Sequence, residues 1–185
     1  MKVIDLGAGK IGVAEARTDV LCSEEADVVL VPQTLSREVN LEGEIVGLTG
    51  FATLYAAASL ECPCPLLCGC RTRVGEVLRV SVFTFTNGRL IDIADRTISP
   101  TYGGGQEGDK IKVLTLSKLR LGLLVDTDIL FAGNWKKLAP HVDAIAGIAL
   151  SCGEREFEYL SALSARYQIP YAVAFEDGSL LWGTK

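Results

Sequence analysis

The stretch Lys118–Phe131 (KLRLGLLVDTDILF) constrains the fold more than any other part of this chain. Its centre, Leu119–Val125, is an apolar run of strand length, which is typical of a strand buried on both faces of a layered α/β protein. The run ends at Asp126-Thr127-Asp128, so two carboxylates follow the strand at the edge where open α/β sheets bind ligands. Asn134 is the expected N-cap of a helix that begins at Trp135. The sequence therefore predicts a site at this junction of strand, acidic turn and helix.

Composition restricts the class of protein. The chain has 185 residues, 49 % of them apolar and 22 % charged, which predicts one globular domain over residues 1–185. The net charge of −5 and the absence of a Lys/Arg cluster argue against nucleic acid or an anionic membrane as a partner. Asp5 lies where a signal peptide needs an apolar run, and no apolar run is long enough to span a bilayer. A cytoplasmic protein with six reduced cysteines is expected.

The apolar periodicity predicts helix-linked strands, then a series of hairpins, then helix-linked strands again. Expected strands are Lys2–Leu6, Val28–Val31, Leu66–Arg71, Val77–Thr86, Arg89–Ala94, Lys112–Leu116, Leu119–Val125, Ala144–Leu150, Tyr171–Phe175 and Ser179–Trp182. Expected helices begin at Val13, at Glu42 (ending near Leu60), at Trp135 and at Glu154 (ending near Tyr167). Asn87-Gly88 indicates a tight hairpin turn. The fold class is therefore α/β, a mixed-sheet domain with helices on the outside.

A glycine-rich segment after the first expected strand has two interpretations. Gly7–Gly12 matches the GxGxxG pattern of dinucleotide-binding turns. That pattern also needs an acid at the end of the second strand, where this chain has Pro32-Gln33, and a dehydrogenase needs a substrate domain as well. A plain glycine-rich turn is the favoured interpretation, and no cofactor is predicted.

Four cysteines are clustered with the spacing C-x-C-x3-C-x-C, at Cys62, Cys64, Cys68 and Cys70. This is not a usual zinc spacing. Cys68 and Cys70 are two residues apart on an expected strand and so share a face, while Cys62 and Cys64 lie in a proline loop. Small buried apolar residues are favoured over metal or redox use, and no metal site is predicted.

The order of elements and four local patterns resemble the nitrilase (carbon–nitrogen hydrolase) superfamily. The patterns are the strand ending in Pro-Gln (Asp27–Gln33), the hairpin strand after a turn glycine (Gly88–Thr97), the apolar strand and acidic elbow (Gly122–Asp128), and Asp143-Ala144-Ile145. The resemblance implies an α-β-β-α sandwich, a homodimer, and hydrolysis of nitriles or amides through a Glu–Lys–Cys triad. In this chain the three triad positions hold Gln33, Arg96 and Asp126, and the chain is short for the family.

These departures affect the chemistry directly. The family's reaction needs a thiolate nucleophile and a base that activates it. Gln33 has no basic lone pair, and Arg96 holds its protons too tightly to transfer one. We therefore expect a catalytically degenerate nitrilase-like protein that binds a small ligand or a partner. The expected ligand-binding positions are Gln33, Arg96, Asp126, Asp128 and Cys152.

Alternatives stay open at this point. Asp126 and Asp128, with Asp95 and Glu107 nearby, could hold a hard cation; the favoured interpretation is that Asp126 pairs with Arg96 and that Asp128 caps the following turn. Gln33 is expected to hydrogen-bond to that pair. A different function is an active amidase-like hydrolase that uses rearranged residues such as Cys152 or Asp126. A third is a scaffold without a ligand that acts through dimerisation.

Overall fold

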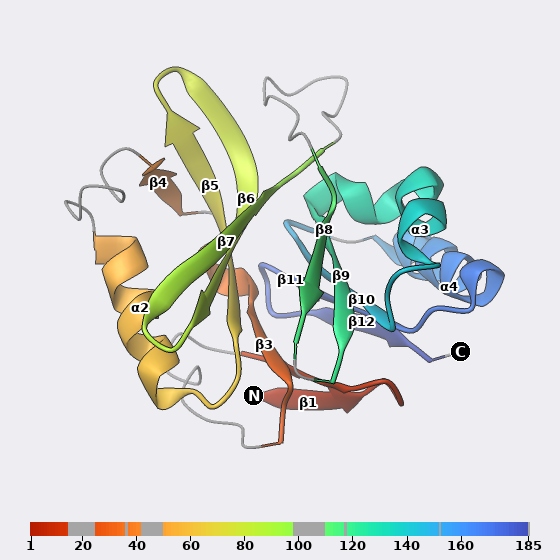
Figure 1. Ribbon diagram of the computed structural model, residues 1–185. Coiled ribbons are helices and arrows are strands. Elements are labelled where there is room, and N and C mark those ends of the chain that lie inside the picture. The colour runs from red at the N-terminus through yellow and green to blue at the C-terminus, as the bar shows by residue number, and fades with distance from the viewer. Residues whose placement is uncertain are drawn as a thin grey trace.

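Two β-sheets packed face to face form the centre of the protein, with helices on both outer sides (Figure 1). The computed structural model describes residues 1–14, 25–35, 37–41, 50–97, 110–116, 118–151 and 153–184, without the side chains of Gln33 and Glu154. Helix α2 (Gly50–Glu61) covers one sheet, and helices α3 (Ala132–Leu138) and α4 (Glu154–Tyr167) cover the other. This arrangement is the expected α-β-β-α sandwich.

The first sheet contains most of the N-terminal half of the chain. Its order within the described residues is β1-β2-β3-β5-β6-β7, and β4 also pairs with β5. The strands are β1 (Lys2–Asp5), β2 (Lys10–Val13), β3 (Val28–Val31), β4 (Glu38–Asn40), β5 (Leu66–Val74), β6 (Val77–Thr86) and β7 (Arg89–Asp95). The β6–β7 turn has positive φ at both Asn87 (49°) and Gly88 (76°), as a type I′ hairpin requires, so the predicted turn is confirmed.

The second sheet has the order β12-β11-β10-β9-β8. Its strands are β8 (Lys112–Thr115), β9 (Arg120–Val125), β10 (Ala144–Ala149), β11 (Tyr171–Phe175) and β12 (Leu180–Gly183). The three central strands are parallel, while β8 and β12 pair antiparallel at the edges. Because helices and the other sheet cover both faces, these central strands are apolar apart from Arg120 at the exposed start of β9, which is the pattern that predicted them.

Alternate residues of each central strand enter different apolar cores. In β9, Leu121, Leu123 and Val125 pack between the two sheets, whereas Leu124 packs beneath α3 and α4. A Cβ atom at Gly122 would lie 2.9 Å from Leu138 Cδ1, so glycine lets α3 approach the strand closely. A third core lies between the first sheet and α2, where Phe51 and Tyr55 contact aromatic rings of β6.

Two helix predictions were wrong within the described residues. Val13 belongs to β2, which forms a hairpin with β1 through the Gly7–Gly9 turn, and Gly12 also lies in that strand. The expected helix beyond residue 14, like the first part of the helix expected from Glu42, falls outside the described residues. Asn134 is inside α3 and not at its N-cap, because the helix begins at Ala132.

None of the helices in the described parts of the chain is both long and apolar enough to span a membrane.

Candidate functional site

Asp126 lies at the carboxyl end of β9, where the chain turns sharply into the short 3-10 helix η2 (Asp126–Leu130). Its φ angle is +52°, in the left-handed region that non-glycine residues seldom adopt. Such a conformation costs free energy and persists only where the surrounding structure holds it. The turn therefore holds the carboxylate at the strand end, as a nucleophile elbow holds its side chain.

Arg96 reaches this carboxylate from the other sheet. It directly follows β7, and its backbone N–H donates to Val80 O at 2.8 Å, which extends the pairing with β6 by one residue. Its Nη1 lies 2.8 Å from Asp126 Oδ2, and the two side chains are only 8 % and 9 % exposed. The ion pair predicted between Arg96 and Asp126 is confirmed, and it joins the two sheets at a buried point.

The second oxygen of Asp126 faces a third strand. The backbone N–H of Leu150, just past the end of β10, donates to Asp126 Oδ1 at 3.4 Å. The carboxylate is thus shared between a guanidinium from the first sheet and a main-chain donor from the second. Charge-assisted hydrogen bonds of this kind satisfy a buried carboxylate and fix its orientation.

Asp128 is 2 % exposed, and its role differs from the predicted one. Its Oδ2 accepts a hydrogen bond from the Thr97 N–H at 2.7 Å, and so reaches across to the segment after β7. The following turn is closed instead by the Asp128 backbone carbonyl, which accepts from the Phe131 N–H and from Asn134 Nδ2, each at 3.2 Å. Two neighbouring carboxylates therefore hold two consecutive residues that directly follow β7 of the other sheet. We call Arg96, Thr97, Asp126 and Asp128 the inter-sheet clamp.

The space beside Asp126 is small. A cavity of about 30 Å³ is bounded by the elbow, the end of β10 and the start of α4, and its described lining includes Ser151, Glu156 and Phe175. This volume accommodates one or two water molecules. Pockets that enclose a small-molecule ligand usually have volumes of at least about 300 Å³. Among the described residues, Asp126 is thus closely surrounded by protein.

Two of the predicted site positions, Gln33 and Cys152, lie partly or wholly outside the described residues. The backbone of Gln33 lies in η1 (Pro32–Thr34), at the carboxyl end of β3, while its side chain falls outside the described residues, as does all of Cys152. The hydrogen bond expected between Gln33 and the ion pair stays a prediction. The residue after Gln33 is Thr34, whose buried hydroxyl donates to Gly69 O and connects η1 to β5.

Asp95, one of the carboxylates considered for a cation site, is bound elsewhere. It accepts from Arg79 Nη1 at 2.7 Å and from Ser81 Oγ at 2.6 Å, while Glu107 lies outside the described residues. No group of three or more potential metal-ligating side chains occurs within the described ranges.

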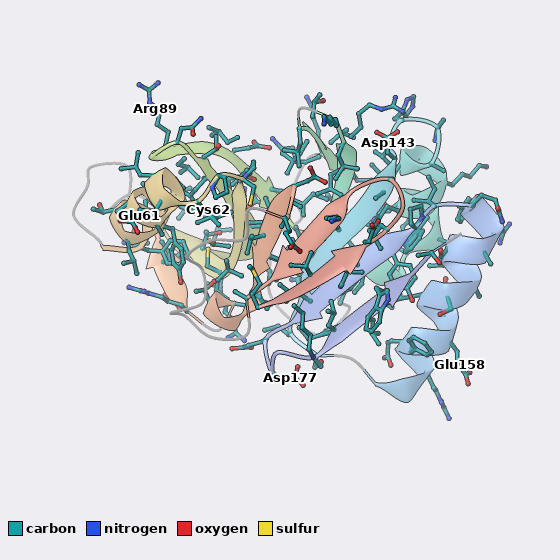
Figure 2. All side chains as sticks on the ribbon, turned by 90° about the horizontal axis from the view of Figure 1, so that it is seen from below. Glu61, Cys62, Arg89, Asp143, Glu158 and Asp177 are labelled. Carbon is teal, nitrogen blue, oxygen red and sulfur yellow. The ribbon has the colours of Figure 1, made fainter. Side chains whose placement is uncertain are left out.

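The four clustered cysteines are buried and reduced, and they pack between the first sheet and α2. Cys68 and Cys70 share a face of β5 as predicted, and Cys62 at the end of α2 (Figure 2) lies 3.6 Å from Cys64, sulfur to sulfur. The hydrogen bond with Cys62, together with burial, raises the pKa of the Cys64 thiol well above its usual range. Burial and the neighbouring Cys70 raise the pKa of the Cys68 thiol.

We therefore expect these four thiols to react slowly in the folded protein, because burial shields all four from a reagent. At Cys64 and Cys68 the raised pKa also depletes the thiolate, which is the reactive form. The measurement is labelling with an aromatic disulfide near pH 8 in a Cys22→Ser/Cys152→Ser variant, which keeps only the cluster. Labelling should be slow in buffer and fast in denaturant, which serves as the control. Fast labelling of the folded variant would contradict this packing.

The backbone donors of the clamp were missed by sequence reasoning. The N–H groups of Thr97 and Leu150 donate to Asp128 and Asp126 respectively, yet every residue type except proline carries such a group. The spacing of residues gives no signal for them, since only the packing of two strand ends against the elbow brings them within reach.

Several proteins of known structure share this fold. Nit3 of Saccharomyces cerevisiae, a member of branch 10 of the nitrilase superfamily, gives a TM-score of 0.67 at 9 % identity, over 86 % of this chain and 73 % of its own. A nitrilase-superfamily amidase from Nesterenkonia AN1 gives 0.64 at 15 % identity, over 85 % and 67 %. The glutamine-dependent NAD+ synthetase of Acinetobacter baumannii gives 0.60 at 15 % identity, over 87 % and 37 %.

These similarities establish that the protein has the nitrilase-superfamily fold, as the resemblance in sequence implied. The chain spans little more than a third of the NAD+ synthetase and 61 % of a carbon–nitrogen hydrolase from Helicobacter pylori. No protein-family model and no curated protein matches the sequence.

Proposed function

We propose that this protein is a nitrilase-fold protein without thiolate-based hydrolysis, which acts by binding a small ligand or a protein partner. The observation that carries the proposal is the buried Arg96–Asp126 ion pair at the elbow. An acid bound to a guanidinium occupies the strand end at which the family resemblance implies a cysteine nucleophile.

The properties of the paired groups support this proposal. A guanidinium remains protonated at any physiological pH, so Arg96 cannot act as an acid or base there. The Asp126 carboxylate already accepts from Arg96 and from the Leu150 N–H, which hold its lone pairs away from an attacking trajectory. In this proposal Arg96, Asp126 and Asp128 join the two sheets, and ligand contacts at this edge fall to Gln33 and Cys152. The homodimer and the single-domain organisation implied by the sequence are part of the same proposal.

One observation favours the alternative, an active amidase-like hydrolase with rearranged residues. The small cavity is lined by Asp126, Ser151 and Glu156. Cys152 directly follows Ser151 in the sequence. In that alternative a carboxylate of this cavity would serve as the base for the Cys152 thiol. An activity measurement on the whole protein separates the two functions.

We expect the purified protein to release no ammonia above background from simple aliphatic amides and nitriles. The physical reason is that no base and thiol remain at the triad positions. The same assay on Cys152→Ala, with Cys22→Ala as the matched control, should give the same background. Turnover that persists in Cys22→Ala and disappears in a folded Cys152→Ala variant would reject the proposal in favour of the hydrolase.

A further inference from the structure

An open cleft lies between β8 and α3, on the outer side of the second sheet. Its volume is about 460 Å³, within the range of small-molecule sites. Ile111, Val113 and Leu138 form an apolar wall, and Thr97 and Asn134 line the cleft where it meets the inter-sheet clamp. The cleft is thus separate from the small cavity beside Asp126.

The ionisable side chains in the described lining of the cleft are all basic. Lys110, Lys137 and His141 line it, and the described lining contains no acidic side chain, although the whole chain carries a net charge of −5. Lys110 and Lys137 form no ion pair with any residue in the described ranges. Lys112, two residues later and at the start of β8, is by contrast paired with Asp92 at 2.8 Å.

The inner end of the cleft is held rigidly. Asn134 is 2 % exposed, and its Nδ2 donates to the backbone carbonyl of Asp128, whose side chain in turn accepts from the Thr97 N–H. Two lining residues are thereby attached to the same buried carboxylate residue. A preorganised wall of this kind lowers the entropic cost of binding a ligand.

We propose that this cleft binds a small organic anion. The carboxylate or phosphate oxygens of the ligand accept hydrogen bonds from Lys110, Lys137 and His141, each of which carries at least one N–H donor. The apolar part of the ligand packs against Val113 and Leu138. The proposal does not depend on the loss of hydrolysis, because the cleft lies outside the triad positions.

The position of the lysines at the end of α3 has a simpler explanation, which the experiment must distinguish from anion binding. Lys136 and Lys137 both lie in the last turn, where cations interact favourably with the helix dipole. Only Lys137 lines the cleft, so Lys136→Gln is a matched control for Lys137→Gln. The two variants change the net charge and the helix end in the same way.

The test is a titration of the full chain, followed by amide NMR shifts, with phenyl phosphate, benzoate, inorganic phosphate and benzyl alcohol. We expect saturable shifts around residues 110–113 and 134–141 with a Kd on the order of 1 mM for at least one aromatic anion. Benzyl alcohol should produce none, and inorganic phosphate should bind more weakly than phenyl phosphate because it lacks the apolar part. The two aromatic anions distinguish a preference for phosphate from one for carboxylate.

Lys110→Gln and Lys137→Gln should each weaken binding by about two- to fivefold, the range for partly exposed ion pairs. Lys136→Gln should leave the Kd unchanged, and added salt should weaken binding to the parent protein. An absence of saturable shifts would overturn the proposal. An equal loss in Lys136→Gln and Lys137→Gln would overturn it too, since it would indicate only the general field of the helix end.

Discussion

Replacing Asp126 with asparagine should lower the free energy of unfolding by about 3–5 kcal/mol, because it leaves the Arg96 guanidinium buried without a counter-charge. Asparagine is the appropriate replacement, since it tolerates the left-handed conformation that Asp126 adopts at φ +52°. The loss of stability then measures the removal of the charge and not a change in backbone strain. Replacing Arg96 with methionine should cost a similar amount, because the Leu150 N–H would then be the remaining donor to the buried Asp126 carboxylate among the described residues.

The decisive measurement is a double-mutant cycle of these two substitutions followed by denaturant unfolding. The double variant should lose much less stability than the two single variants lose together. The reason is that each single substitution leaves one buried charge without its partner, whereas the double variant contains no such charge. Strict additivity would show that the two residues do not interact. It would also remove the main support for placing these two residues at the triad positions that the family resemblance implies.

The chain offers an exposed ion pair as the control for this cycle. Glu38 and Arg73 contact each other across β4 and β5, but their side chains are 48 % and 40 % exposed. Water and salt screen such a pair, so a cycle of Glu38→Gln and Arg73→Gln should give a coupling far smaller than that of Arg96 and Asp126. The difference between the two cycles measures the effect of burial on an ion pair in one protein.

Replacing Trp135 with alanine should destabilise the protein by about 3–5 kcal/mol, the usual cost of removing a large buried aromatic side chain. Trp135 is fully buried, and its ring contacts Tyr171 edge-on with the centroids 5.8 Å apart. Its Nε1–H also donates to Ile129 O at 2.8 Å, which connects α3 to the 3-10 helix after the elbow. The residue therefore supports the elbow by packing and by a hydrogen bond together.

Two variants separate these contributions. Trp135→Phe keeps most of the apolar contact and leaves the Ile129 carbonyl without this donor, so it should cost about 1–3 kcal/mol. Trp182→Ala changes the only other tryptophan of the chain, which is 52 % exposed, and should cost less than about 1 kcal/mol. Equal unfolding curves for Trp135→Ala and Trp182→Ala would contradict this description of the core.

The sequence by itself determined the elements whose signals are local. The apolar runs of β3 and β9 predicted buried strands because helices or another sheet cover both of their faces. Asn87-Gly88 predicted the β6–β7 turn because few residues tolerate two successive positive φ angles. Helix α4 was predicted with its observed bounds, Glu154–Tyr167, from apolar residues at helical spacing. The two oppositely charged residues of the clamp were also predicted to pair, but only through the family resemblance.

Tertiary structure decided the features that depend on contacts between distant segments. Val13 fits a helical pattern on its own, yet the backbone hydrogen bonds of β1 and β3 draw it into a strand. Asp128 is by its residue type an acceptable cap for the next turn, but its side chain accepts a hydrogen bond from the Thr97 N–H, 31 residues away in sequence. The cleft beside α3 likewise combines residues from three separate segments. Local sequence patterns determine which backbone conformations are favourable. The hydrogen-bond partners of the polar groups between the two sheets depend instead on which groups are buried together, and only the packed fold specifies that.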